Sequence, residues 1–160
     1  MTNNFPKMNF VGLDGILVQF SDEIRENANS AALAFRHEVE QKNQSSIIES
    51  ANSLTAAYFR IDTKIQPLDT ILNFFNEMLR EKNWYTSKLP ADRKLFKIPC
   101  VFGTELAPQF ENVIKLAGIS RSQAILEFTT TRTRVMTIGF SPGQPYAGLL
   151  SKKWDLPRLA

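Results

Sequence analysis

The chain has 160 residues, of which 43% are apolar and 22% are charged, as is typical of one ordinary folded domain or two small ones. No apolar run reaches the roughly 18 residues of a membrane span, and residues 1–7 lack a secretory signal, so we expect a cytoplasmic protein without a membrane partner. The single cysteine excludes an internal disulfide and a Cys-rich metal cage, and we expect no metal site.

The net charge of +3 is unevenly distributed. Residues 1–84 carry 8 basic and 11 acidic side chains, whereas residues 85–160 carry 11 basic and 5 acidic ones. The second part is therefore expected to bind anionic ligands or partners. Because its basic residues are scattered, they indicate a phosphate- or carboxylate-bearing ligand or an acidic protein partner rather than nucleic acid.

The first half alternates between strand and helix patterns. Period-two runs predict paired strands joined at Asp14-Gly15, and capping residues then precede a helix with one apolar stripe. Two more strands and a second helix follow, so the order β-β-α-β-β-α predicts a compact α+β domain over residues 1–84. The predicted elements are strands Lys7–Leu13 and Gly15–Phe20, helix Arg25–Lys42, strands Ile47–Ile48 and Leu54–Ile61, and a helix after Gln66-Pro67.

The second half begins after a mixed-charge stretch that we interpret as a linker, residues 85–94. It predicts a strand over Leu95–Phe102, a helix that ends at Gly118, a second helix from Ser120, and a strand over Arg132–Ile138. Residues 95–160 would thus form a second domain.

Two isolated residues are interpreted as structural. Cys100 lies between Pro99 and Val101 in an apolar run, which favours a small core residue over a nucleophile. The only histidine, His37, stands beside charged residues of the first helix, which favours the surface.

A loop rich in Pro and Gly follows the last predicted strand, in the sequence IGFSPGQPYAGLL. Pro142 fixes φ and Gly143 permits positive φ, so the loop predicts a stiff platform that carries Phe140 and Tyr146. Such a platform can bind a ligand or partner. The alternative is a tight turn that closes a sheet and buries both aromatic rings.

Common catalytic signatures are absent from the sequence: there is no Walker loop, dinucleotide fingerprint, nucleophile elbow or zincin motif. The remaining candidates are Glu105, after a predicted strand, and Arg132 and Arg134, on one face of another. Paired arginines can hold phosphate or carboxylate, but charged residues also protect an edge strand from aggregation. The catalytic residues stay unassigned.

Four segments resemble one family: GLDGILVQFSDEI, IPCVFGTELAP, LAGISRSQAI and TRVMTIGFSPGQPYAGLL. They are similar to the B subunit of bacterial 5-oxoprolinase, also named allophanate hydrolase subunit 1, a family that includes Kip-type inhibitors of histidine kinases. The resemblance implies that the α+β domain is followed by the first part of a cyclophilin-like β-barrel. It also implies partners that resemble the C and A subunits of 5-oxoprolinase, and ATP-dependent opening of 5-oxoproline to glutamate, or instead binding to a histidine kinase.

Three positions depart from the family pattern, since Phe128 replaces a usual His, Gln144 replaces a second loop aromatic, and Gly148-Leu149 replaces a double Gly. The chain also ends where the implied barrel is about half built, so we expect an oligomer in which another copy, a C-type subunit or exchanged strands cover the second half. Two hypotheses follow: a hydrolase subunit that is inactive alone, or a non-catalytic binding module.

Overall fold

The computed structural model describes residues 5–139 and 141–157, and the chain divides into two compact units. Unit 1 joins the chain up to Arg93 with Met136–Tyr146, and unit 2 joins Lys94–Val135 with the chain from Ala147 onward. The second half of the chain thus contributes a segment to unit 1, which the division of the sequence at residues 85–94 did not include.

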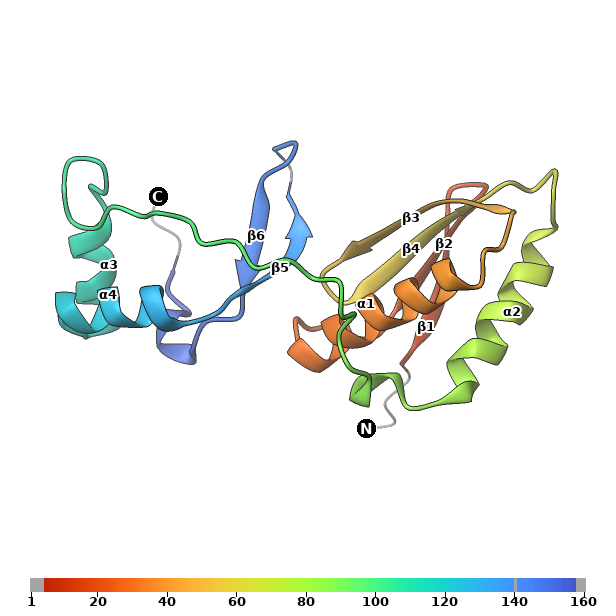
Figure 1. The fold of residues 1–160 in the computed structure, drawn as a ribbon, viewed down its shortest axis with the longest axis horizontal. Helices are drawn as coiled ribbons and strands as arrows, with labels where there is room; N and C mark the ends of the chain where they lie inside the picture. Colours follow the sequence, from red (N-terminus) through yellow and green to blue (C-terminus); the bar gives the residue numbers. More distant parts are fainter. Residues whose placement is uncertain (1–4, 140, 158–160) are drawn as a thin grey trace. The chain divides into compact units, whose positions relative to one another are not determined.

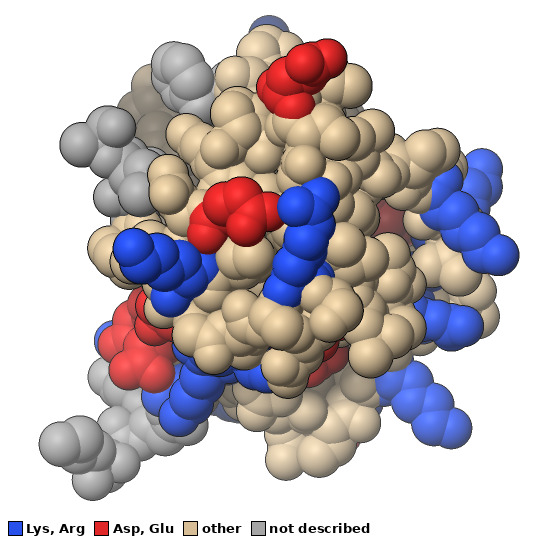
Figure 2. Space-filling model, turned by 90° about the vertical axis from the view of Figure 1, so that its left-hand side faces the viewer, with Lys and Arg blue, Asp and Glu red and all other residues tan. Residues whose placement is uncertain are grey.

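The two units differ in charge. Unit 1 holds 10 basic and 12 acidic residues, which gives −2, and unit 2 holds 9 basic and 4 acidic residues, which gives +5. On the face that Figure 2 shows, Lys and Arg side chains are spread around the surface among fewer Asp and Glu side chains. The basic residues form no single dense patch on this face, which agrees with their scatter in the sequence.

Unit 1 is built on a four-stranded antiparallel sheet with the strand order β1-β2-β4-β3 (Figure 1). The two central strands pair Ile16 with Phe59 and Val18 with Ala57, and the helices cover the sheet face that these residues share. The predicted α+β class and the predicted element order are both confirmed. The elements are β1 (Lys7–Val11), β2 (Gly15–Gln19), α1 (Glu26–Gln41), β3 (Ile47–Ser53), β4 (Ala56–Ile61) and α2 (Leu68–Glu81).

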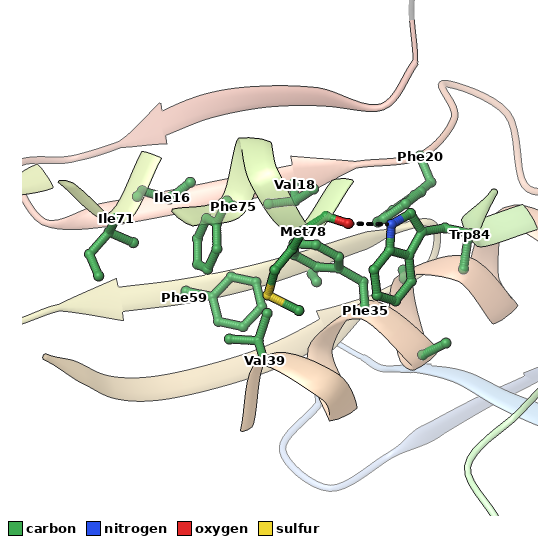
Figure 3. Close-up of a cluster of buried hydrophobic side chains, with 14 of the residues drawn as sticks. Ile16, Val18, Phe20, Phe35, Val39, Phe59, Ile71, Phe75, Met78 and Trp84 are labelled. Atoms are coloured by element: carbon green, nitrogen blue, oxygen red, sulfur yellow. Dashed lines mark hydrogen bonds between the residues drawn. The ribbon is translucent and has the colours of Figure 1, made fainter. Parts of the chain in front are cut away.

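The core of unit 1 is centred on Phe35 of α1, which is fully buried (Figure 3). Its ring centroid lies 5.0 Å from that of Trp84 and 5.7 Å from that of Phe75. The Trp84 indole N–H donates to the carbonyl of Met78 at 3.1 Å, which satisfies the one polar atom of this buried side chain.

The folded part of unit 1 continues beyond the predicted boundary at residue 84. A short 3-10 helix, η1 (Trp84–Thr86), follows α2. Tyr85 is a residue of the predicted linker. Its hydroxyl donates to the Phe20 carbonyl at 2.7 Å. Partial burial raises the pKa of this phenol.

Unit 2 contains two short helices and a smaller core. Gly118 adopts φ +65° at the end of α3, and the Ser120 hydroxyl accepts from the Gln123 amide at 3.2 Å at the start of α4. Both predicted helix boundaries are therefore confirmed. The elements of unit 2 are α3 (Phe110–Ala117), α4 (Arg121–Thr130) and the 3-10 helix η2 (Lys152–Trp154). The two-stranded sheet of β5 (Arg134–Ile138) and β6 (Pro145–Gly148) has residues in both units, since Met136–Tyr146 belongs to unit 1.

Several predictions need correction. No helix or strand is formed between Ser87 and Gln109, so the predicted strand Leu95–Phe102 is wrong, and Cys100 is exposed rather than in a core. A strand requires a neighbour, and within the described residues this segment has none. The strand predicted from Arg132 begins at Arg134. His37 is partly exposed, like its neighbours Arg36 and Glu38.

Candidate functional site

The Pro/Gly loop connects β5 to β6. The Gly139 amide donates to the Gln144 carbonyl at 2.8 Å, and the Gln144 amide donates to the Ser141 carbonyl at 3.0 Å. Gly143 has φ +79°, which the sequence anticipates, whereas Phe140 lies outside the described residues. The loop is therefore a closed, hydrogen-bonded turn.

Tyr146 folds back over this turn. A Cβ atom on Gly139 would lie 1.6 Å from the ring of Tyr146, so glycine is required there. The ring remains 44% exposed, and Pro142 and Gly143 are exposed as well. Tyr146 thus packs against Gly139 inside the loop while part of the residue stays exposed to solvent.

The strand that leads to this loop is fixed to the turn between β3 and β4. The Leu54 amide donates to the Met136 carbonyl at 3.0 Å, and the Ser53 and Thr137 hydroxyls lie 3.2 Å apart. The side-chain amide of Asn29, which is 1% exposed, donates to the Leu54 carbonyl. Asn29 therefore positions the turn that holds β5.

Sequence reasoning missed Asn29. The signal was available, since Asn29 is a polar residue next to the apolar stripe of α1. A buried polar side chain in such a place requires a hydrogen-bond partner.

Arg121 joins two of the four segments that carry the family resemblance. Its Nη2 donates to the Gly103 carbonyl at 3.0 Å and the Phe102 carbonyl at 3.3 Å, and its Nη1 donates to Glu111 Oε1 at 2.9 Å. We call this arrangement the Arg121 clamp. One guanidinium donates hydrogen bonds to the Glu111 carboxylate and to both carbonyls. It therefore fixes the chain that enters α3 to the first turn of α4.

Gly103→Ala is expected to destabilise unit 2 by about 1–3 kcal/mol. Gly103 has φ +67°, and a Cβ atom there would lie 2.0 Å from Arg121 Nη2. Gly118→Ala is the matched control, because Gly118 has φ +65° with nothing within 4 Å of the added atom. Urea unfolding gives the loss of unfolding free energy in each variant. The difference between the two losses measures the clash between the added Cβ atom and Arg121. Equal losses would show that Arg121 moves aside freely.

The three predicted charged residues do not form one described cluster. Glu105 is exposed between Gly103 and α3, and Arg132 is exposed between α4 and β5. Within the described residues no hydrogen bond or ion pair joins these two side chains. Arg134 is the first residue of β5, is partly buried, and has an interaction partner. The shared strand face predicted for the two arginines is lost because Arg132 precedes the strand.

Phe128, which the resemblance compares with a His of the family, lies in an aromatic cluster. Its ring is stacked on Phe102 with centroids 6.0 Å apart and lies 4.4 Å from the ring of Trp154. Its neighbour Glu127 accepts from Lys153 Nζ at 2.7 Å and from the Trp154 indole at 3.0 Å. These two hydrogen bonds lower the pKa of Glu127.

The contact of Glu127 with η2 should weaken in acid. A folded-state pKa below the unfolded value adds stability that is present above the unfolded pKa and is lost as the pH falls through the folded pKa. We therefore expect Trp154 fluorescence, measured in a Trp84→Phe background, to change only at a pH below the ordinary titration range of a glutamate carboxyl. Glu127→Gln should remove this transition, and an unchanged transition in that variant would contradict the assignment.

Other features of a site are few in the part of the chain that the structure describes. No group of three or more His, Cys, Asp or Glu side chains there could hold a metal ion. No described helix has the length and apolar character to cross a membrane. A shallow hollow of about 370 Å³ lies between the end of α1 and β3, and one of about 120 Å³ lies beside Tyr85; neither includes a predicted site residue.

Comparison with known proteins identifies the family. A family model described as carboxyltransferase domain, subdomain C and D, matches residues 6–160. The chain is 26% identical over 155 residues to the 5-oxoprolinase B subunit of Bacillus subtilis (strain 168), covering 92% of this chain and 65% of that protein. It is 29% identical over 83 residues to the 5-oxoprolinase B subunit of Escherichia coli O157:H7, covering 51% of this chain and 38% of that protein.

A solved structure shares the fold. The crystal structure of TTHA0988 in space group P6522 matches with a TM-score of 0.67 at 18% identity, over 91% of this chain and 27% of that one. The chain thus spans less than two thirds of the length of each of these relatives. The family predicted from the four segments is confirmed, and the chain belongs to the family of the carboxyltransferase domain, subdomain C and D.

Proposed function

We propose that the chain is one component of a 5-oxoprolinase-like system, in which ATP-dependent hydrolysis opens the ring amide of 5-oxoproline to give glutamate. The observation that carries the proposal is the similarity over 155 residues to a protein named as the B subunit of 5-oxoprolinase. The Arg121 clamp supports it, because it connects the motifs Ile98–Glu105 and Leu116–Ile125, which carry the resemblance.

The residues of this chain indicate which steps of the reaction it would contribute to and which its partners would perform. We assign ATP to a partner that resembles the A subunit, since the sequence contains no phosphate-binding Gly-rich loop. The product and the substrate both carry a carboxylate, which an exposed guanidinium such as that of Arg132 is suited to bind. Glu105 is the candidate for proton transfer, in a site completed by a partner that resembles the C subunit.

The second candidate function is a non-catalytic binding module, in the manner of histidine-kinase inhibitors. The observation in its favour is Phe128, whose ring packs between Phe102 and Trp154 where the family usually has a His. An apolar, packed side chain supplies no acid or base. In this function the exposed part of Tyr146 would contact the kinase.

Reconstitution tests the proposal. We expect the purified chain alone to form no glutamate from 5-oxoproline and ATP, and to become necessary for turnover when the A-type and C-type subunits from the same source are added. Arg132→Ala and Glu105→Gln should each reduce this turnover by about tenfold or more, whereas Lys115→Ala on the exposed face of α3 should not.

Two results would contradict the proposal. One is full turnover by the A-type and C-type subunits without this chain. The other is tight binding of the chain to a histidine kinase, with loss of autophosphorylation and no contribution to glutamate formation, which would establish the binding module.

A further inference from the structure

Glu105 lies on a short turn that two hydrogen bonds close. The Ala107 amide donates to the Thr104 carbonyl at 2.8 Å, so Glu105 and Leu106 are the two central residues of a four-residue turn. The Leu106 amide also donates to the Thr104 hydroxyl at 3.2 Å. Glu105 is exposed, and within the described residues no hydrogen bond or ion pair engages its carboxylate. The backbone of the turn is therefore held, while the Glu105 carboxylate can meet a substrate.

The Arg121 clamp holds the chain directly before this turn. Its Nη2 donates to the carbonyls of Phe102 and Gly103, and the Gly103 carbonyl belongs to the peptide bond that precedes Thr104. Gly103 leaves room for the guanidinium, since a Cβ atom there would lie 2.0 Å from Nη2. The direction in which the chain enters the turn, and with it the position of Glu105, thus depends on a side chain of α4.

A lysine could not make the same contacts as this guanidinium. The planar group reaches the Glu111 carboxylate through Nη1 and the two carbonyls through Nη2, so one rigid fork holds three acceptors. A lysine ammonium carries a charge of the same sign, but it is a single point of charge on a flexible stem. Arg121→Lys therefore keeps the charge and removes the geometry of the clamp.

We propose that Arg121 is a positioning residue for Glu105, on which it acts by fixing the turn of residues 104–107. The inference rests on the proposed function, in which Glu105 is the candidate for proton transfer. Opening the ring amide adds one water across the C–N bond, so one proton must move from water to the ring nitrogen, and the Glu105 carboxylate would carry it. Transfer requires the carboxylate to lie about 3 Å from its donor and acceptor, so a small displacement of the turn slows the reaction.

Amide exchange of the isolated chain tests whether Arg121 fixes the turn. In Arg121→Lys the Leu106 and Ala107 amides should exchange about tenfold faster, while residues 114–117 of α3 keep their protection. Arg80→Lys makes the same change at an exposed position of α2 and should leave all of these amides unaffected. Unchanged exchange at Leu106 and Ala107 would contradict the inference. Loss of protection throughout α3 would contradict it too, since Arg121 would then serve the stability of unit 2 in general.

Turnover in the reconstituted system tests whether the fixed turn serves Glu105. Arg121→Lys should lower kcat about tenfold and leave the KM for 5-oxoproline unchanged, because Glu105 is placed to move a proton and not to hold the substrate. In a Glu105→Gln background the same substitution should lower kcat by less than about twofold, since no carboxylate remains to be positioned. A residue needed only for folding would lower kcat by the same factor in both backgrounds.

The outcomes separate this inference from the proposed function. Equal factors in the two backgrounds contradict the inference, and so does an unchanged kcat for Arg121→Lys in a system that requires this chain. Both results leave the proposed function standing. A system that needs no copy of the unaltered chain for turnover rejects the proposed function, and the inference with it. Arg80→Lys is again the control and should support full turnover.

Discussion

Phe35→Ala is expected to destabilise unit 1 by about 3–5 kcal/mol, a large part of the roughly 5–15 kcal/mol that holds a domain folded. Phe35 is fully buried, and its ring contacts Phe20, Phe59, Phe75 and Trp84 at centroid distances of 5.0–6.0 Å. Removing it leaves a cavity between α1, the sheet and α2 that rigid neighbours on every side cannot fill.

Urea unfolding followed by Trp84 fluorescence measures this loss. Phe10→Ala is the matched control, because Phe10 is 60% exposed on the edge strand β1 and undergoes the same chemical change. We expect the control to lose less than about 1 kcal/mol. Equal losses in the two variants would mean that Phe35 is not the centre of the core.

Phe128→Ala is expected to have the second largest effect, a loss of about 2–3 kcal/mol confined to unit 2. The estimate is lower than for Phe35 because Phe128 is only partly buried. The core of unit 2 is small, with only Phe110, Ile114 and Ala124 buried in its cluster among the described residues. Loss of the ring that links Phe102 to Trp154 should therefore open α3 and α4 locally.

Amide exchange resolved by residue tests this prediction. Protection should fall in α3 and α4 of Phe128→Ala and stay unchanged in β2 and β4. Leu126→Ala is the control, since Leu126 lies on the same helix and is 61% exposed. Phe128→His should also destabilise unit 2, because a polar ring would replace an apolar one in the cluster. A stable Phe128→His protein would show that the family's His fits without repacking.

The elements that the sequence predicted well are those whose signals are local. The stripe Ala28, Ala31, Ala32 and Phe35 is sufficient to define one face of α1. Gly118 ends α3 through its own positive φ, and Ser120 begins α4 through the hydrogen bond that its side chain accepts. The order β-β-α-β-β-α followed from such local signals, although only Ile47–Ile48 of β3 showed a strand pattern in the sequence.

The candidate site was less predictable because it depends on contacts between distant segments. An apolar run at residues 95–102 satisfies the pattern of a strand, yet a strand forms only where a neighbour pairs with it. Arg121 is an ordinary exposed arginine in the sequence, and its role became visible only through the carbonyls of Phe102 and Gly103. Glu105 and Arg132 were grouped by chemistry alone, and no described contact joins them.

Amide exchange of the chain, alone and mixed with the A-type and C-type subunits from the same source, tests most directly whether it is a component of a 5-oxoprolinase-like system. We predict that residues 15–19 of β2 are strongly protected in the isolated chain, whereas the exposed residues 95–101 exchange rapidly. Mixing with the other subunits should slow exchange in at least one segment that is exposed in the isolated chain. The account is contradicted if the other subunits form glutamate without this chain and leave its exchange unchanged throughout the described residues.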